Sequence, residues 1–221
     1  MKRFAGIAGF LLIGSLLFAQ NSTSAASAFL RLIRTGSPDQ VLGAIKEGAD
    51  VMQRDATGLT PLMSAAQDNP NPEVVKVLIT AGANIEDRDA LGFTPLMWAA
   101  GGNSNPQVMN ALLTAGANVM AKSREGETSL IWCANNNPNP EVMRMLLAAG
   151  ASVNDADSSG MTALMWAAKA NSNPKIVTLL LGAGANGKTV NFSGKTAFDY
   201  AGDNGKLKGT SAYWALNNAG Y

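Results

Sequence analysis

Apolar positions along the chain recur in two short stretches within every 34 residues. The first stretch, residues 61–67, opens with a proline and contains two adjacent alanines. It predicts a short helix, because proline suits the first helical turn. The second stretch, residues 73–81, has its apolar side chains at the three- and four-residue spacing of an amphipathic helix. We therefore expect a second helix that buries one stripe, formed by Val74, Val75, Leu78 and Ile79.

The polar residues between these stretches predict where the helices begin and end. A turn rich in Asn and Pro separates the two helices, with Asn71 placed as the N-cap and Pro72 as the first residue of the second helix. Gly82 predicts a left-handed C-cap, and residues 84–91 suit an extended finger or hairpin. Such a unit cannot bury its apolar face alone, so successive units must stack.

Two independent series of glycines recur every 34 residues along the chain. One series opens phrases such as GLTPLMSAA, at Gly58, Gly92, Gly126, Gly160 and Gly194. The other ends the second helix with phrases such as GAN, at Gly48, Gly82, Gly116, Gly150 and Gly184. Together they predict one repeat domain over residues 26–221, divided into an N-cap at 26–57, repeats at 58–91, 92–125, 126–159 and 160–193, and a C-cap at 194–221.

These phrases resemble the ankyrin repeat family, in which a Thr-Pro-Leu-His phrase and two alanines precede a second helix and a Gly-Ala-Asn ending. The resemblance implies an all-α ankyrin-repeat solenoid of stacked helix-turn-helix units with finger loops or short hairpins. The period of 34 exceeds the family's usual period of about 33 by one residue in the Asn-Pro turn. The family's His is also missing, and the matching residues are Met63, Met97, Ile131, Met165 and Asp199. We expect the hydrogen bonds that this His makes to be absent and an apolar side chain to fill its place.

The N-terminus predicts export. Met1, Lys2 and Arg3 form a short basic start, and an uncharged apolar run follows over residues 4–19. This combination is typical of a secretory signal peptide over residues 1–19, with cleavage after Ala19 or as late as residue 28. The alternative is an uncleaved membrane anchor, which the shortness of the run disfavours, since a bilayer needs about twenty residues.

Charge and composition exclude several function classes. Removing Lys2 and Arg3 from 17 basic residues leaves 15 against 16 acidic ones, a net charge of −1, which favours neither nucleic acid nor an anionic membrane as a partner. We expect no stable membrane insertion once the signal peptide is cleaved. The chain has no His and one Cys, which removes the commonest general base and the commonest metal ligand. We therefore expect no cofactor, no metal and no catalysis, and an enzyme is the least favoured alternative.

Several polar residues have simple structural interpretations. The series Asp55, Asp89, Ser123, Asp157 and Asn191 occupies one register, and each residue is expected to cap its own finger turn. Cys133 replaces an alanine of the first helix and is expected to be a small buried core residue. The asparagines over residues 135–139 are interpreted as a turn.

The series Trp98, Trp132, Trp166 and Tyr200 has a further possible role, and the first repeat has Ser64 at this position. Each Trp either packs between neighbouring first helices or anchors a partner, and the two interpretations are compatible. The family resemblance implies a concave binding face. The matching residues are Leu91, Phe93, Trp98 and Gly102 in one repeat, Arg124, Glu125, Glu127, Trp132 and Asn136 in the next, and Ser159, Met161, Trp166 and Lys169 in the third.

The sequence thus predicts an exported, periplasmic or secreted scaffold that binds a protein through its concave face and fingers. We expect the chain to be a monomer. A membrane-tethered scaffold is the alternative if residues 1–19 stay attached.

Overall fold

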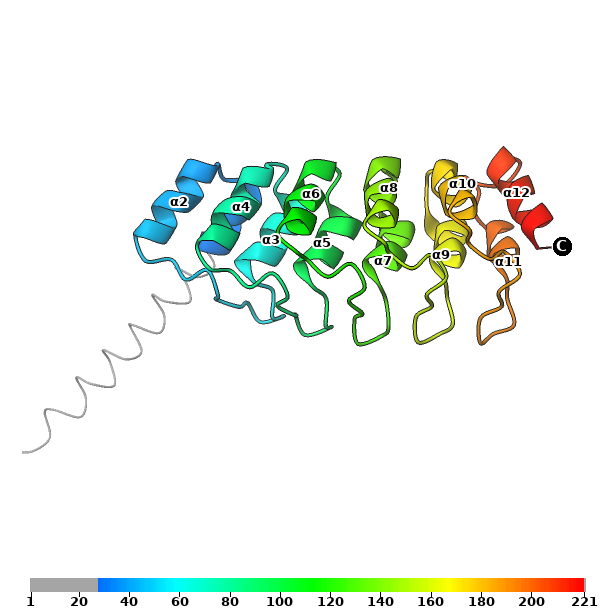
Figure 1. The fold of residues 1–221 in the computed structure, drawn as a ribbon, viewed down its shortest axis with the longest axis horizontal. Coiled ribbons are helices and arrows are strands. Elements are labelled where there is room, and N and C mark those ends of the chain that lie inside the picture. The colour runs from blue at the N-terminus through cyan, green and yellow to red at the C-terminus, as the bar shows by residue number, and fades with distance from the viewer. Residues whose placement is uncertain (1–27, 221) are drawn as a thin grey trace, which may run out of the picture.

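The computed structural model describes residues 28–220, so the predicted signal peptide and most of its candidate cleavage positions lie outside the described part. Two rows of short helices run side by side along one axis, and loops project from one side of the array (Figure 1). A helix over residues 28–35 begins the row of first helices, which continues with α3 (Pro61–Asp68), α5 (Pro95–Gly102), α7 (Ser129–Asn136), α9 (Ala163–Ala170) and α11 (Ala197–Ala201). The second helices are α2 (Pro38–Lys46), α4 (Pro72–Thr80), α6 (Pro106–Thr114), α8 (Pro140–Ala148), α10 (Pro174–Gly182) and α12 (Ser211–Ala219). The predicted all-α repeat solenoid is confirmed.

The predicted caps of the second helices are confirmed. Asn71 accepts a hydrogen bond from the backbone N–H of Glu73 at 3.0 Å, and Pro72 is the first residue of α4. Gly82 has a φ of 97°, in the left-handed region that favours glycine. Each second helix therefore begins and ends on local signals that are visible in the sequence.

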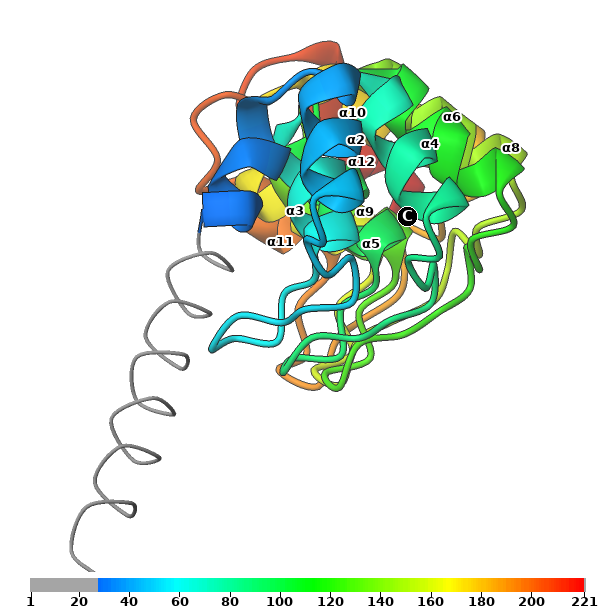
Figure 2. The ribbon, with the colours of Figure 1, turned by 90° about the vertical axis from the view of Figure 1, so that its left-hand side faces the viewer.

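The buried core runs continuously through the array. Small residues such as Ala65 and Ala66 on α3 are fully buried, which lets neighbouring first helices approach closely. First helices contact one another more extensively than second helices do. We call the surface formed by the first helices and the fingers the concave face. Figure 2, viewed from one end, shows the fingers projecting on one side of the stack.

The position of the missing His is filled as expected in four units. Met63, Met97, Ile131 and Met165 are each at most 2% exposed. The last unit differs, because Asp199 is exposed and its carboxylate accepts a hydrogen bond from the backbone N–H of Thr196 at 2.7 Å. Within residues 28–220 no further repeat packs on this unit, and its Asp199 makes a capping contact in place of an apolar one.

A ladder of buried asparagines joins successive repeats. The side-chain amide of Asn137 donates to the backbone carbonyls of Ala100 and Asn103 in the preceding repeat, at 3.0 and 2.9 Å. Its Oδ1 accepts from the backbone N–H of Asn139 at 2.9 Å, within its own turn. The asparagine ladder, which repeats this arrangement, consists of Asn69, Asn103, Asn137, Asn171 and Asn204.

The N-cap asparagines add a second row of contacts between repeats. Asn139 Nδ2 donates to the carbonyl of Ser104 at 2.8 Å, and Asn173 Nδ2 donates to the carbonyl of Pro138 at 2.7 Å. The turn predicted over residues 135–139 is confirmed for residues 137–139, whereas Asn135 and Asn136 form the end of α7. Its role in linking repeats goes beyond that prediction.

The fingers are also joined to one another. The backbone N–H of Arg124 donates to the carbonyl of Leu91 at 3.0 Å, and that of Ser158 donates to the carbonyl of Glu125 at 2.8 Å. A Cβ at Gly92 would lie 3.0 Å from the backbone nitrogen of Arg124, so the close approach of the next finger requires glycine there, as does its φ of 82°. Two fingers include an isolated antiparallel bridge, Lys122 with Thr128 and Ala156 with Thr162.

Both ends of the array carry polar side chains on their outer surfaces, as expected of terminal units. Arg31, Arg34, Lys46 and Glu47 are exposed in the first unit, and Lys206 and Lys208 in the last. Among residues 28–220, none of the helices combines the length and the apolar character that a membrane crossing requires.

The asparagine ladder generates a prediction on stability. Asn137→Ala removes two donors to buried carbonyls and one acceptor for a turn amide, and we expect it to lower the free energy of unfolding by about 2 to 3 kcal/mol. Denaturant titration followed by circular dichroism measures this change. The matched control is the adjacent exposed Asn136→Ala, which should stay within about 0.5 kcal/mol of the wild type. Equal effects of the two substitutions would contradict the role of the ladder.

Candidate functional site: the concave face

A row of half-buried aromatic side chains follows the first helices along the concave face. Trp98 lies on α5, Trp132 on α7 and Trp166 on α9, and Tyr200 on α11 continues the row. None of these four side chains is fully buried. Large aromatic rings therefore reach the surface at the same place in four successive units.

Two of the indoles are fixed by carboxylates of the fingers. Trp98 Nε1 donates to Asp89 Oδ2 at 3.1 Å, and Trp166 Nε1 donates to Asp157 Oδ2 at 2.8 Å. In the last unit the chemistry is reversed, because Asn191 Nδ2 donates to the Tyr200 hydroxyl at 2.8 Å. Each pair joins a first helix to its own finger, nine residues earlier in the chain.

The same acidic residues cap the finger turns, as predicted. Asp89 Oδ1 accepts from the backbone N–H groups of Leu91 and Phe93 at 2.8 and 2.9 Å. Asp157 Oδ1 accepts in the same way from Ser159 and Met161. One carboxylate thus shapes the finger with one oxygen and holds the indole with the other.

Ser123 is the exception in this series. Its hydroxyl accepts from the backbone N–H of Glu127 at 3.1 Å, but its short side chain offers no second oxygen to Trp132. Trp132 instead packs edge-on against Phe93, with ring centroids 4.8 Å apart, and against the preceding repeat at Gly101. A Cβ at Gly101 would lie 2.3 Å from the Trp132 ring, so glycine makes room for the indole.

Charged groups lie beside the aromatic row on the third finger. Arg124 and Glu125 are exposed, and Glu125 accepts a hydrogen bond from the Ser158 hydroxyl at 2.8 Å. Burial raises the pKa of Glu127, and the nearby Asp157 and Glu125 carboxylates raise it further, while a hydrogen bond from Ser123 opposes the shift. This part of the concave face therefore presents a cluster of carboxylates next to one arginine.

Cations cover the C-terminal end of the row. Lys169 Nζ lies 4.6 Å from the centroid of the Trp166 ring and 5.7 Å from that of Tyr200. Lys195 Nζ lies 5.4 Å from the Tyr200 centroid. Such cation–π contacts stabilise the exposed ring faces.

The structure places most of the predicted partner-binding residues at the surface. Leu91 is 61% exposed. The other exposed members are Gly102, Arg124, Glu125, Asn136, Ser159 and Lys169, and the half-buried members are Trp98, Glu127, Trp132 and Trp166. Two members differ from the expectation of a surface position: Phe93 and Met161 are only 4% and 3% exposed, and the Phe93 ring packs against Trp98 and Trp132.

Two exposed apolar residues escaped the sequence prediction. Val190 and Phe192 on the last finger are 56% and 83% exposed. Val190 has the register of Lys122, and Phe192 has the register of Arg124. Both of these earlier residues are exposed, so the 34-residue period is the signal by which Val190 and Phe192 could have been found.

The titratable groups of the core have structural roles. Cys133 is fully buried, as predicted, and burial raises the pKa of its thiol well above the ordinary range. Within the part of the chain that the structure describes, no three acidic, Cys or His side chains group as metal ligands would.

Comparison with known proteins identifies the repeat. A family model described as ankyrin repeats in three copies matches the chain over residues 29–123, 103–191 and 130–211. The curated protein sequences include no match to the chain.

The two kinds of Trp environment generate a prediction. Trp166→Phe removes an N–H donor to the Asp157 carboxylate, whereas Trp132→Phe makes the same change where no carboxylate accepts. Because hydrogen bonds to charged groups are the stronger ones, we expect Trp166→Phe to cost about 1 kcal/mol more free energy of unfolding than Trp132→Phe. Paired denaturant titrations measure this difference. If both substitutions cost the same, the carboxylates do not hold the indoles.

Proposed function

Because the chain belongs to the ankyrin repeat family, we propose that it is an exported, non-catalytic scaffold that binds a protein along its concave face and fingers. Ankyrin repeats are generally protein-binding scaffolds and generally carry no catalysis. The partner's identity is a separate question, since a fold does not specify it.

The observation that carries this proposal is the aromatic row bordered by charged fingers. Half-buried Trp side chains supply large contact area with little loss of conformational freedom, and Trp and Arg are the residues most enriched in interface hot spots. Trp98 and Trp132 flank the second and third fingers, and Arg124 is exposed beside them. These groups lie on one surface that the finger-to-finger hydrogen bonds hold in place.

The outer face, formed by the second helices, offers a contrast. Its charges pair within single helices, Lys76 with Glu73 on α4 and Arg144 with Glu141 on α8. Arg124 on the concave face has no ion-pair partner within residues 28–220. A partner with acidic groups would therefore gain more from Arg124 than from the outer-face arginine.

Export generates the first functional prediction. The basic start and the apolar run over residues 4–19 lead us to expect a mature chain that begins between Gln20 and Phe29. Intact-mass measurement and N-terminal sequencing of protein recovered from the envelope fraction or the medium test this. Recovery of chains that retain Met1 in the membrane fraction would instead favour the tethered scaffold.

The concave face generates the second functional prediction. We expect affinity capture with the mature chain, followed by mass spectrometry, to identify the partner, and Arg124→Glu to weaken that partner's binding at least tenfold. The unfolding midpoint should hardly change, because the side chain is exposed.

The matched control is Arg144→Glu on the outer face, the same charge reversal at an equally exposed arginine. It should leave the partner's affinity within about twofold. The concave-face proposal fails if Arg144→Glu abolishes binding and Arg124→Glu does not.

A further inference from the structure

The aromatic row has one gap. At the register of the Trp series, the first unit has Leu30 and the first full repeat has Ser64, so a serine stands between a leucine and Trp98. Ser64 is 8% exposed and lies on α3, where an indole lies in each of the next three repeats. The space that a large side chain would fill in this repeat is therefore open to another occupant.

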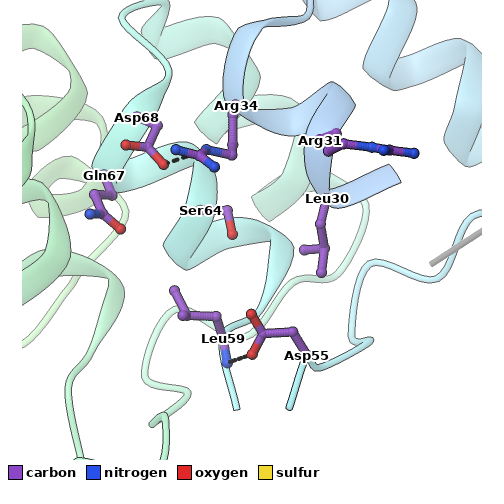
Figure 3. A pocket seen from close by; sticks show the side chains of 8 residues that line it. All are labelled: Leu30, Arg31, Arg34, Asp55, Leu59, Ser64, Gln67 and Asp68. Carbon is purple, nitrogen blue, oxygen red and sulfur yellow. Dashed lines mark hydrogen bonds and ion pairs between the residues drawn. The ribbon is translucent and has the colours of Figure 1, made fainter. Parts of the chain in front are cut away.

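A cavity of about 240 Å³ occupies this place. Figure 3 shows Ser64 on α3, with Leu30 to one side of it and Leu59 and Asp55 together below it. Arg31 and Arg34 lie at its rim, and Arg34 is paired with Asp68 at 2.8 Å. The walls thus combine apolar carbons with one carboxylate that comes from the finger.

Asp55 is the counterpart of the carboxylates that hold the indoles. Its Oδ1 accepts from the backbone N–H groups of Thr57 and Leu59 at 2.8 and 3.0 Å, which is the same finger cap that Asp89 makes. No indole reaches Asp55, because position 64 is a serine. Asp55 is exposed, whereas Asp89 beneath Trp98 is only 7% exposed.

The protonation state of Asp55 suits an N–H donor. Burial acts to raise its pKa, but hydrogen bonds from Thr57, Leu59 and Gly58 outweigh this and lower the pKa below the ordinary value. The carboxylate is therefore ionised at neutral pH and offers a charged acceptor to whatever enters the cavity.

We propose that this cavity receives a tryptophan side chain of the partner protein, whose indole N–H donates to Asp55 as Trp98 and Trp166 donate to their own aspartates. The proposal rests on the proposed function, that the chain binds a protein. The incoming indole completes the row between Leu30 and Trp98, with its ring against Leu59 and its N–H on the finger carboxylate.

Size and charge favour an indole over other side chains. A dry cavity of roughly 150 Å³ accommodates benzene in a protein interior, so about 240 Å³ has room for the larger indole. Two arginines and two aspartates line the cavity, and this balance gives no preference for a lysine or arginine of the partner. Cations at the rim also suit an indole, because a guanidinium stacks on an aromatic face. The ammonium of Lys169 lies over the Trp166 ring in a comparable cation–π contact.

The first test uses N-acetyltryptophanamide with the ¹⁵N-labelled mature chain, followed by NMR. We expect saturable shifts of the backbone amides of Leu59, Ser64 and Gln67, which line the cavity. N-acetyl-1-methyltryptophanamide has the same ring without the N–H donor, and we expect it to bind at least tenfold more weakly. Shifts that do not saturate, or equal affinities of the two probes, would overturn the proposal.

Two variants test the same site from the protein side. Asp55→Asn keeps a cap that Asn191 already makes at this register, with Oδ1 accepting from Ser193 and Lys195 at 3.0 Å, but it replaces the second oxygen by a donor. We expect Asp55→Asn to lower the affinity for the probe at least tenfold. Glu47→Gln neutralises an exposed carboxylate outside the cavity and should leave this affinity unchanged. Equal affinities of Asp55→Asn and the wild type would refute the role of the carboxylate.

Ser64→Trp fills the cavity with a side chain of the protein itself. We expect it to abolish probe binding and to lower the affinity for the captured partner at least tenfold. Undiminished probe binding, or undiminished partner affinity, would overturn the proposal. Should this variant not fold, the methylated probe and Asp55→Asn still decide the question. Failure here leaves the concave-face proposal intact, since that proposal depends on the comparison of Arg124→Glu with Arg144→Glu.

Discussion

The stacking of repeats depends on one buried side-chain amide in each turn. Asn137 satisfies two carbonyls of the preceding repeat with its Nδ2 and an amide of its own turn with its Oδ1. A buried carbonyl without a partner costs free energy that the small core of a single repeat does not offset. The ladder therefore fixes both the shape of each turn and the distance to its neighbour. With that distance set, the fingers meet closely enough for backbone hydrogen bonds, and Trp132 lies against Gly101 and Phe93 of the preceding repeat.

The aromatic row follows from the same regular spacing. An indole on a first helix reaches only its own finger and the repeat before it, so each rung is built from local residues. Asp89 and Asp157 serve two purposes, because one oxygen caps the finger and the other accepts from the indole. The row is thus both a part of the scaffold and an exposed surface, and this surface is the one that we propose binds the partner.

Much of the fold could be predicted from the sequence because its signals are local. Asn71 and Pro72 start a helix and Gly82 ends one whatever surrounds them, and the 34-residue period places the same signals in every unit. The site was less predictable, since Trp98 meets Asp89 only after the finger folds back on its helix. Phe93 illustrates the limit. Its register matches Leu59 and Glu127, which are only half-buried, yet its own side chain is buried beside Trp98 and Trp132, a contact that depends on both rings.

A one-dimensional array lets each unit change its chemistry without disturbing the others, and the row varies accordingly along its length. Cations cover the rings at Trp166 and Tyr200, whereas Trp98 and Trp132 pack against Phe93, and the first full repeat has a serine above an exposed carboxylate. The finger cap is present in that repeat although the indole is absent, so the cap does not depend on the ring. The first full repeat therefore has only the acceptor of the carboxylate–indole pair, and the donor that we propose for it comes from the partner.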